Sequence, residues 1–183
     1  MASSSSRNVA IAAIVVIAMG AGMFVGRYIA AHRVVEVVQP AVTWHAGDVL
    51  PPFALVSESG DSVTSTDMLT HGGVVLVLDL ECPPCVEMAQ KWNRAINDGV
   101  VRVDQVIGIT MHSRDAIARF RADTGIQFAV YRDAESALLS NGWVMSFPLE
   151  VIVGEGGTVV AVSGDSTAPI DQDAIQAAGM GGL

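Results

Sequence analysis

Residues 73–85 read Gly-Val-Val-Leu-Val-Leu-Asp-Leu-Glu-Cys-Pro-Pro-Cys, an apolar run that ends in two cysteines three positions apart. A near-continuous apolar run of this length predicts a central strand that is covered on both faces of its sheet. Helical periodicity follows over residues 83–97, and proline suits the first turn of a helix because its missing N–H needs no partner there. The sequence therefore places a Cys-x-x-Cys pair between a buried strand and the start of a helix.

Cys82 and Cys85 are the only cysteines of the chain, and their position favours thiol–disulfide chemistry. Free N–H groups and partial positive charge at a helix start favour a thiolate on Cys82. Such a thiolate attacks a disulfide, and the second sulfur resolves the mixed disulfide that results. We predict that Cys82 and Cys85 are catalytic residues and form a redox-active disulfide.

Three other roles of the two cysteines are open. A structural zinc site needs four ligands, and the chain has no second Cys-x-x-Cys and no paired histidines. We therefore predict neither a metal nor a cofactor. A structural disulfide across so short a loop would constrain the unfolded chain little, and a pair of inert buried thiols is the third possibility.

A second feature is the apolar segment near the N-terminus. Residues 9–26 contain no charged side chain, and 18 such residues are close to the minimum for a transmembrane helix. Arg27, Tyr28 and Arg33 follow, as is typical of the headgroup region. We predict a cytoplasmic N-terminus at residues 1–7 and a transmembrane signal anchor at residues 8–31. A tether at residues 32–46 then leads to a folded domain at residues 47–183.

A cleavable signal peptide is the alternative, because Ala18-Met19-Gly20 or Gly20-Ala21-Gly22 could serve as a small-x-small cleavage site. The apolar run continues past that point, which favours a retained anchor. The arginines around the run favour a cytoplasmic domain, whereas a redox-active cysteine pair suits an oxidising compartment. We give the chemistry more weight and predict a single-pass membrane protein with a periplasmic C-terminal domain.

The charge of the chain excludes one class of partner. It carries 10 Lys and Arg against 19 Asp and Glu, a formal net charge of −9 at pH 7. Nucleic-acid binding needs a basic surface that neutralises phosphates. We therefore predict no nucleic-acid partner.

Strand and helix patterns alternate on both sides of the cysteines, and the last two strands form a hairpin. This order predicts an α/β fold in which helices flank a mixed central sheet. The predicted strands after the cysteines are 101–110, 128–131, 149–153 and 158–163, and the predicted helices are 113–122, 133–141 and 171–178. A short return strand at 63–65 and a helical turn at 66–69 precede the central strand.

The order of these landmarks resembles the thioredoxin superfamily, in particular its membrane-anchored thiol–disulfide oxidoreductases of the TlpA, ResA and DsbE kind. The resemblance covers about residues 47–178. Four segments carry it: the opening at 47–55 with the turn at Gly60, the Cys82-Pro83-Pro84-Cys85 tetrad, the strand at 106–110, and Phe147-Pro148 before the hairpin.

The resemblance implies roles for single residues. Cys82 matches the exposed nucleophile and Cys85 the resolving thiol. Pro148 matches a cis-proline that faces the pair and, with Phe147, binds the substrate backbone. The resemblance also implies partners: proteins with dithiols or disulfides as substrates, and a membrane thiol transporter as electron donor.

The chain departs from the family pattern around the cysteines. Glu81 stands where the family usually has Trp, and a carboxylate beside Cys82 opposes a thiolate there, which favours a more reducing couple. Leu76 and Met88 stand where relatives place an acidic residue. The proton acceptor for the second cysteine is therefore open among Asp79, Glu81 and Glu87. A further departure is the residue after Pro148, which is Leu in place of the usual Thr.

The function that fits best is a membrane-tethered protein-disulfide reductase in cytochrome c biogenesis or metal-site assembly. A maturation factor for a periplasmic dehydrogenase is a related alternative. A Cu(I) chaperone or a non-catalytic binding module is another, since two thiolates suit Cu(I) and Met88 or His112 could add a ligand. A peroxidase is disfavoured, because Asp79 stands where the peroxidatic motif needs Thr.

Overall fold

The computed structural model describes residues 44–144 and 146–180, all of which belong to one compact unit, Gln39–Leu183. Residues 1–43 lie outside the described residues. They include the predicted cytoplasmic N-terminus, the predicted signal anchor and most of the predicted tether. Among the helices of the described residues, none has the length and hydropathy that a membrane span requires. The fold below is that of the C-terminal unit.

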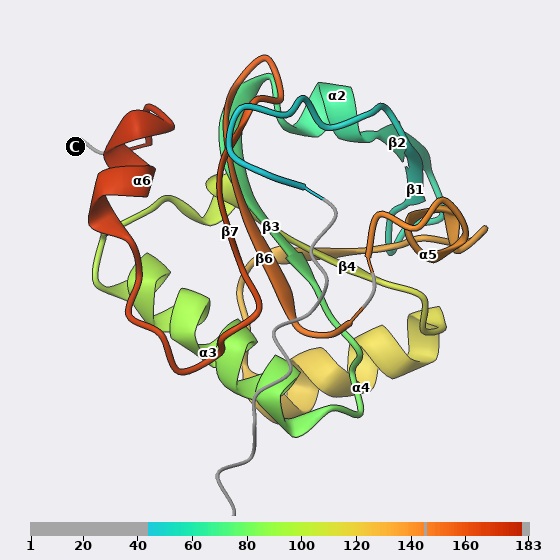
Figure 1. Ribbon diagram of the computed structural model, residues 1–183. Coiled ribbons are helices and arrows are strands. Elements are labelled where there is room, and N and C mark those ends of the chain that lie inside the picture. The colour runs from blue at the N-terminus through green and yellow to red at the C-terminus, as the bar shows by residue number, and fades with distance from the viewer. Residues whose placement is uncertain (1–43, 145, 181–183) are drawn as a thin grey trace, which may run out of the picture. The chain divides into compact units, whose positions relative to one another are not determined.

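Seven strands form one mixed sheet in the order β2-β1-β5-β4-β3-β6-β7 (Figure 1). The central strand β3 pairs in parallel with β4 and antiparallel with β6, and β6 continues into the predicted hairpin with β7. The strands are β1 (Ala54–Val56), β2 (Ser62–Thr64), β3 (His71–Val77), β4 (Val106–Thr110), β5 (Ala129–Arg132), β6 (Leu149–Glu155) and β7 (Val159–Ser163).

Helices cover the sheet on both faces. Buried side chains of α3, α4 and α6 share one core cluster on one face, and α5 packs with the segment before β1 on the other (Figure 1). The helices are α2 (Ser65–Met68), α3 (Pro83–Asn97), α4 (Arg114–Thr124), α5 (Ala137–Ser140) and α6 (Gln172–Ala177), with a 3₁₀ turn η1 (Val103–Gln105). The predicted mixed sheet between helices is confirmed.

The burial of β3 explains the apolar run that marks it in the sequence. Val74 and Leu76 point into the cluster under α3, whereas Val75 and Val77 point into the cluster on the opposite face. All four side chains are at most 1 % exposed. Both faces of the strand are therefore covered, as predicted.

Two predicted elements are shorter than the sequence indicated. The strand expected at 101–110 is confined to β4, because the Arg102 N–H donates to the Gln105 side chain at 2.9 Å and closes the turn η1 ahead of it. The helix expected at 133–141 is confined to α5. The buried Asp133 carboxylate accepts the N–H groups of Ala137 and Leu138, at 2.9 Å each, so this residue precedes the helix and caps it.

Candidate active site

The first turn of α3 places the Cys82 sulfur at the positive end of the helix. Cys82 is the N-cap residue with an extended backbone, and its Sγ accepts the Cys85 N–H at 3.4 Å. Pro83 and Pro84 fill the first helical positions, where their lack of an N–H leaves no hydrogen bond unmade. The side chain is half-buried, so it remains open to a reaction partner.

Cys85 lies directly beneath, with its side chain fully buried. The two sulfur atoms are 2.6 Å apart and both thiols are free. A disulfide bond is about 2.05 Å long, so the pair closes with little movement of the backbone. Burial, and then the hydrogen bond to Cys82, raise the pKa of the Cys85 thiol far above its ordinary value. The site thus pairs an accessible sulfur with a buried one that holds its proton.

The loop before β6 is the third part of the site. The Phe147–Pro148 peptide bond is cis, as the resemblance implied, and Pro148 is buried. Leu149 pairs with Val77 in the antiparallel register of β6 and β3, so the start of β6 lies at the sheet edge where β3 leads to the cysteines. Phe147 and Cys82 pack against the core cluster that contains Cys85. The fold thereby places the Phe147–Pro148 loop at the end of the sheet where β3 leads to the two cysteines.

Comparison with known proteins assigns the family. The family model described as AhpC/TSA family matches residues 46–162. The chain belongs to the AhpC/TSA family. No curated protein matches the chain.

Several solved structures have the same fold as this AhpC/TSA-family chain. A thiol:disulfide interchange protein DsbE from Chlorobium tepidum, described as putative, is 20% identical, with 74% of this chain and 95% of that chain covered at a TM-score of 0.60. A secreted Mycobacterium tuberculosis disulfide oxidoreductase, described as homologous to E. coli DsbE, is 20% identical over 68% of this chain and 92% of that chain, with a TM-score of 0.53. A thiol peroxidase from Chromobacterium violaceum is 16% identical over 76% and 89%, with a TM-score of 0.58. The predicted thioredoxin-superfamily fold is confirmed, and family and fold support the predicted oxidoreductase class.

The sequence analysis missed the pairing of Asp79 with His112 beside the cysteines. His112 follows β4, and its Nε2 lies 3.1 Å from Asp79 Oδ1. The same oxygen accepts the Glu81 N–H at 2.9 Å. His112 was considered only as a copper ligand, because its neighbour in space is 33 residues away in the chain. The short Met-His-Ser segment directly after a buried strand is the one signal that could have drawn attention to it.

The sequence analysis also missed a buried ion pair under the second half of α3. Lys91 Nζ lies 2.8 Å from Glu150 Oε2, and Trp92 Nε1 donates to the same oxygen at 2.7 Å. Both charged side chains are at most 10% exposed. Glu150 sits on β6 opposite Leu76, the position on β3 where relatives place an acid. The only lysine of the chain and one acid within the apolar run 149–153 were the available signals.

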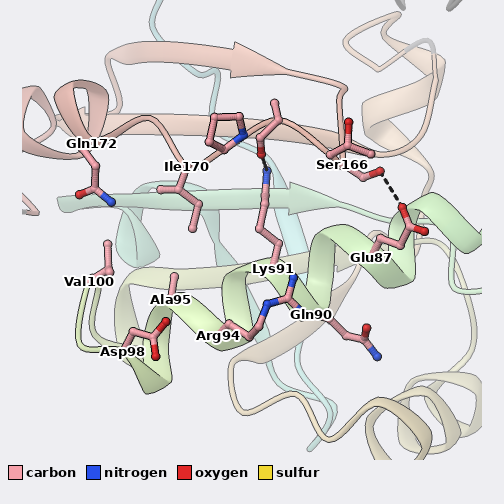
Figure 2. Close-up of a pocket in the computed structure, with 13 residues that line it drawn as sticks. Glu87, Gln90, Lys91, Arg94, Ala95, Asp98, Val100, Ser166, Ile170 and Gln172 are labelled. Atoms are coloured by element: carbon pink, nitrogen blue, oxygen red, sulfur yellow. Dashed lines mark hydrogen bonds between the residues drawn. The ribbon is translucent and has the colours of Figure 1, made fainter.

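Lys91 also borders an open groove of about 740 Å³ between α3 and the segment that follows β7 (Figure 2). Its Nζ donates to the Ala168 carbonyl at 3.4 Å, and the Ser166 hydroxyl donates to Glu87 at 3.2 Å (Figure 2). Glu87 therefore faces this groove, and its carboxylate is bonded away from the cysteines. The groove belongs to the flank of α3 and not to its first turn.

Metal ligation beyond the two sulfurs has little support in the described part of this AhpC/TSA-family protein. No group of three or more His, Cys, Asp or Glu side chains there could hold a metal ion. Met88, one of the two further copper ligands considered, is fully buried in the core. His112, the other, is engaged by Asp79.

Proposed function

We propose that this protein is a membrane-tethered, extracytoplasmic thiol–disulfide oxidoreductase that reduces disulfides in client proteins. The observation that carries the proposal is the asymmetric dithiol at the start of α3. One sulfur is accessible at the helix N-terminus, and the other is buried, protonated and 2.6 Å away. This is the arrangement that a two-step exchange requires, because each sulfur has a separate task.

In the first step the Cys82 thiolate attacks a client disulfide. A bond forms between Cys82 Sγ and one client sulfur, the client S–S bond breaks, and the other client sulfur leaves as a thiolate. The Cys85 N–H, which donates to the Cys82 sulfur at 3.4 Å, and the dipole at the start of α3 stabilise the negative charge on the attacking sulfur. Because Cys85 holds its proton more tightly than an ordinary thiol, it does not compete for the client at this stage.

In the second step Cys85 loses its proton and attacks Cys82 Sγ. The Cys82–Cys85 disulfide forms, the bond to the client breaks, and the client leaves with both of its sulfurs reduced. Two electrons have passed from the dithiol to the client. A membrane thiol donor then returns the pair to the dithiol form by the same exchange in reverse.

The loop around Pro148 supports a role in binding the client. It lies at the same sheet edge as the cysteines, and an extended client segment there can pair with its backbone. The Ser146 hydroxyl is buried and has no hydrogen-bond partner among the described residues. A buried polar group without a partner is costly, so this loop holds a polar atom whose hydrogen bond is unmade.

Glu81 supports the reducing direction. Glu81 is exposed and directly precedes Cys82 in the chain, and a carboxylate close to the attacking sulfur would make the dithiol form a better electron donor. Cytochrome c maturation and metal-site assembly are the roles that the resemblance to the TlpA, ResA and DsbE kind favours, with maturation of a periplasmic dehydrogenase as the alternative. The apolar segment 9–26 supports the membrane tether and the periplasmic location.

Reduction of insulin by the full-length protein in detergent tests the proposal. The wild type accelerates precipitation of the insulin B chain with dithiothreitol as donor, Cys82→Ser abolishes the acceleration, and Cys85→Ser accumulates a mixed disulfide. Hydrogen peroxide as the alternative substrate separates this function from that of a peroxidase. Retained insulin reduction in Cys82→Ser, or faster turnover of peroxide than of insulin, contradicts the proposal.

A further inference from the structure

The cysteine pair has a different neighbour on each of its two flanks. Strand β3, which leads to the cysteines, lies between β6 and β4 in the sheet. On the β6 flank stands the Pro148 loop, along which the client backbone can pair. On the β4 flank the chain continues through His112 into α4, which shares a core cluster with α3 (Figure 1). The exchange described above uses only the β6 flank.

A groove of about 340 Å³ opens on the β4 flank, between the first half of α3 and helix α4. Its apolar lining consists of Leu80, Val86, Ala116 and Phe120. Phe120 is buried, but the other three are only half-buried, so the groove presents apolar surface to solvent. Sites for small ligands begin at about 300 Å³, and the groove therefore has room for a client side chain.

The groove begins one helical turn from the attacking sulfur. The Val86 N–H donates to the Cys82 carbonyl at 3.2 Å, and this spacing of four residues places both on one face of α3. A helical turn rises about 5.4 Å, and an extended chain advances about 3.3 Å per residue. A client residue two positions from its reacting cysteine spans this distance and points to the same side as the cysteine.

The charged side chains around the groove are mainly acidic. Glu81, Asp123 and Arg119 line it, and Asp79 adds a third carboxylate through its bond to His112, which also lines it. Within the described residues, no ion pair or hydrogen bond engages the side chains of Glu81, Asp123 or Arg119. These charges are therefore available to a client, and their acidic excess favours a basic one.

We propose that the groove between α3 and α4 is a second client subsite, which takes an apolar side chain two residues from the reacting cysteine of the client. The proposal rests on the proposed function and specifies its clients as disulfide-bonded proteins with an apolar residue at this position and a basic residue beside it. Such a client is held on both flanks of Cys82. Its backbone pairs along the Pro148 loop, and its apolar side chain packs against Val86 and Phe120.

Short peptides whose single cysteine forms a mixed disulfide with nitrothiobenzoate test the proposal. Cys82 of the reduced full-length protein attacks the peptide sulfur, the S–S bond breaks, and nitrothiobenzoate leaves with the electron pair. Stopped-flow absorbance gives the second-order rate constant. One peptide carries Leu, and another Ser, at both positions two residues from the cysteine. We expect the Leu peptide to react about 10-fold faster, because its side chain is removed from water in the groove.

Ala116→Phe fills the groove without removing a core side chain. We expect the preference for the Leu peptide to fall below about twofold in this variant. Ala118→Phe is the matched control, because Ala118 is exposed on the same helix and does not line the groove. The mixed disulfide of nitrothiobenzoate with 2-mercaptoethanol has no neighbouring side chain. It should react equally fast with both variants and the wild type, which shows that they are folded.

The charge preference is measured with Leu peptides that carry Lys or Glu beside each Leu. At low ionic strength we expect the Lys peptide to react about threefold faster than the Glu peptide, and added salt should reduce this difference. Asp123→Asn should lower the ratio. Asp115→Asn is the matched control, because Asp115 is exposed at the start of the same helix and lies outside the groove. Equal rates for the Lys and Glu peptides overturn the basic residue in the proposal.

Equal rate constants for the Leu and Ser peptides in the wild type overturn the subsite, as does a Leu preference that survives in Ala116→Phe. If Ala116→Phe does not fold, Ala116→Arg places a long side chain across the groove from the solvent side and decides the question. Failure of the proposed function looks different. In that case the wild type reacts with none of the peptides, or releases nitrothiobenzoate without ever forming the Cys82–Cys85 disulfide.

Discussion

The two halves of helix α3 meet different surroundings, although they belong to one continuous element. The first turn carries Cys82 and Cys85 at the edge of the sheet, where one sulfur is accessible and the other is buried. The second half carries Lys91 and Trp92, whose polar atoms are bonded to one buried carboxylate.

The two halves therefore differ in role. Side chains of the first turn take part in the reaction, and side chains of the second half fix the position of the helix on the sheet. The attacking sulfur has to change its charge and its partner, so Cys82 lies where a client can reach it. Glu150, the shared partner of Lys91 and Trp92, lies on β6 two residues after Pro148. The buried ion pair thereby ties the helix that carries the cysteines to the strand that follows the Pro148 loop. The first half of α3 supplies chemistry, and the second fixes where that chemistry takes place.

The largest predicted effect comes from the first turn. Cys82→Ser removes the attacking sulfur, so disulfide reduction falls to the uncatalysed rate, as measured by insulin turbidity. The free energy of unfolding should change by less than about 1 kcal/mol, because the side chain is half-buried and serine can still cap the helix. A large loss of stability would mean that the two halves of α3 do not divide their tasks.

The second half should show the reverse behaviour. Lys91→Met leaves the Glu150 carboxylate buried without its partner charge, and we expect the free energy of unfolding to fall by about 3–5 kcal/mol. Urea denaturation of the reduced protein measures this change. Arg94→Met, at an exposed position of the same helix, is the control and should cost little. The double variant Lys91→Met, Glu150→Gln should recover much of the loss, because it leaves no unpaired charge. Equal changes in the free energy of unfolding for Lys91→Met and Arg94→Met would show that the Lys91–Glu150 ion pair does not stabilise the fold.

The raised pKa of Cys85 predicts a pH dependence that exists only in the reduced protein. A thiol whose pKa is higher in the folded state stabilises the fold fully below its unfolded value of about 9.0, and this contribution declines as the pH rises further. At pH 10 the loss should be about 1.4 kcal/mol relative to pH 8. The oxidised protein has no thiol to ionise and serves as the control. Parallel stability curves for the two forms between pH 8 and pH 10 would contradict the burial of a protonated Cys85.

The smallest predicted effect lies on the surface of the second half. Asn93 Oδ1 accepts the Gln127 N–H at 2.9 Å and so links α3 to the segment that follows α4. Asn93→Ala should lower the free energy of unfolding by about 1 kcal/mol, as urea denaturation can measure, and leave insulin reduction intact. A substantial loss of activity would show that chemistry depends on α3 beyond its first turns.

Local signals in the sequence predicted the elements that carry the cysteines. Proline at the start and Asn-Asp-Gly at the end gave both bounds of α3, and the apolar run gave the buried strand before it. The same kind of signal misled at Asp133, where a residue that caps α5 was taken for part of the helix. An acid close to a helix start fits either role, and only the direction of its hydrogen bonds separates them.

The pairings that complete the site could not be predicted. Asp79 and His112 are 33 residues apart, and Trp92 and Glu150 are 58 apart. Neither pair leaves a periodic pattern, because it arises from the parallel register of β3 with β4 and the antiparallel register of β3 with β6. The expected acid at position 76 is absent, and Glu150 lies directly opposite on the neighbouring strand. Register between strands, and not composition, decided which polar groups meet.

The redox equilibrium of the Cys82–Cys85 pair tests the central claim most directly. The full-length protein is equilibrated in defined mixtures of reduced and oxidised dithiothreitol or glutathione, and its free thiols are then trapped and counted by mass spectrometry. We expect one two-electron transition between a dithiol and a disulfide, with a midpoint potential well below the glutathione range. A protein that never forms the disulfide, or a midpoint near those of the strong periplasmic oxidants, would contradict it.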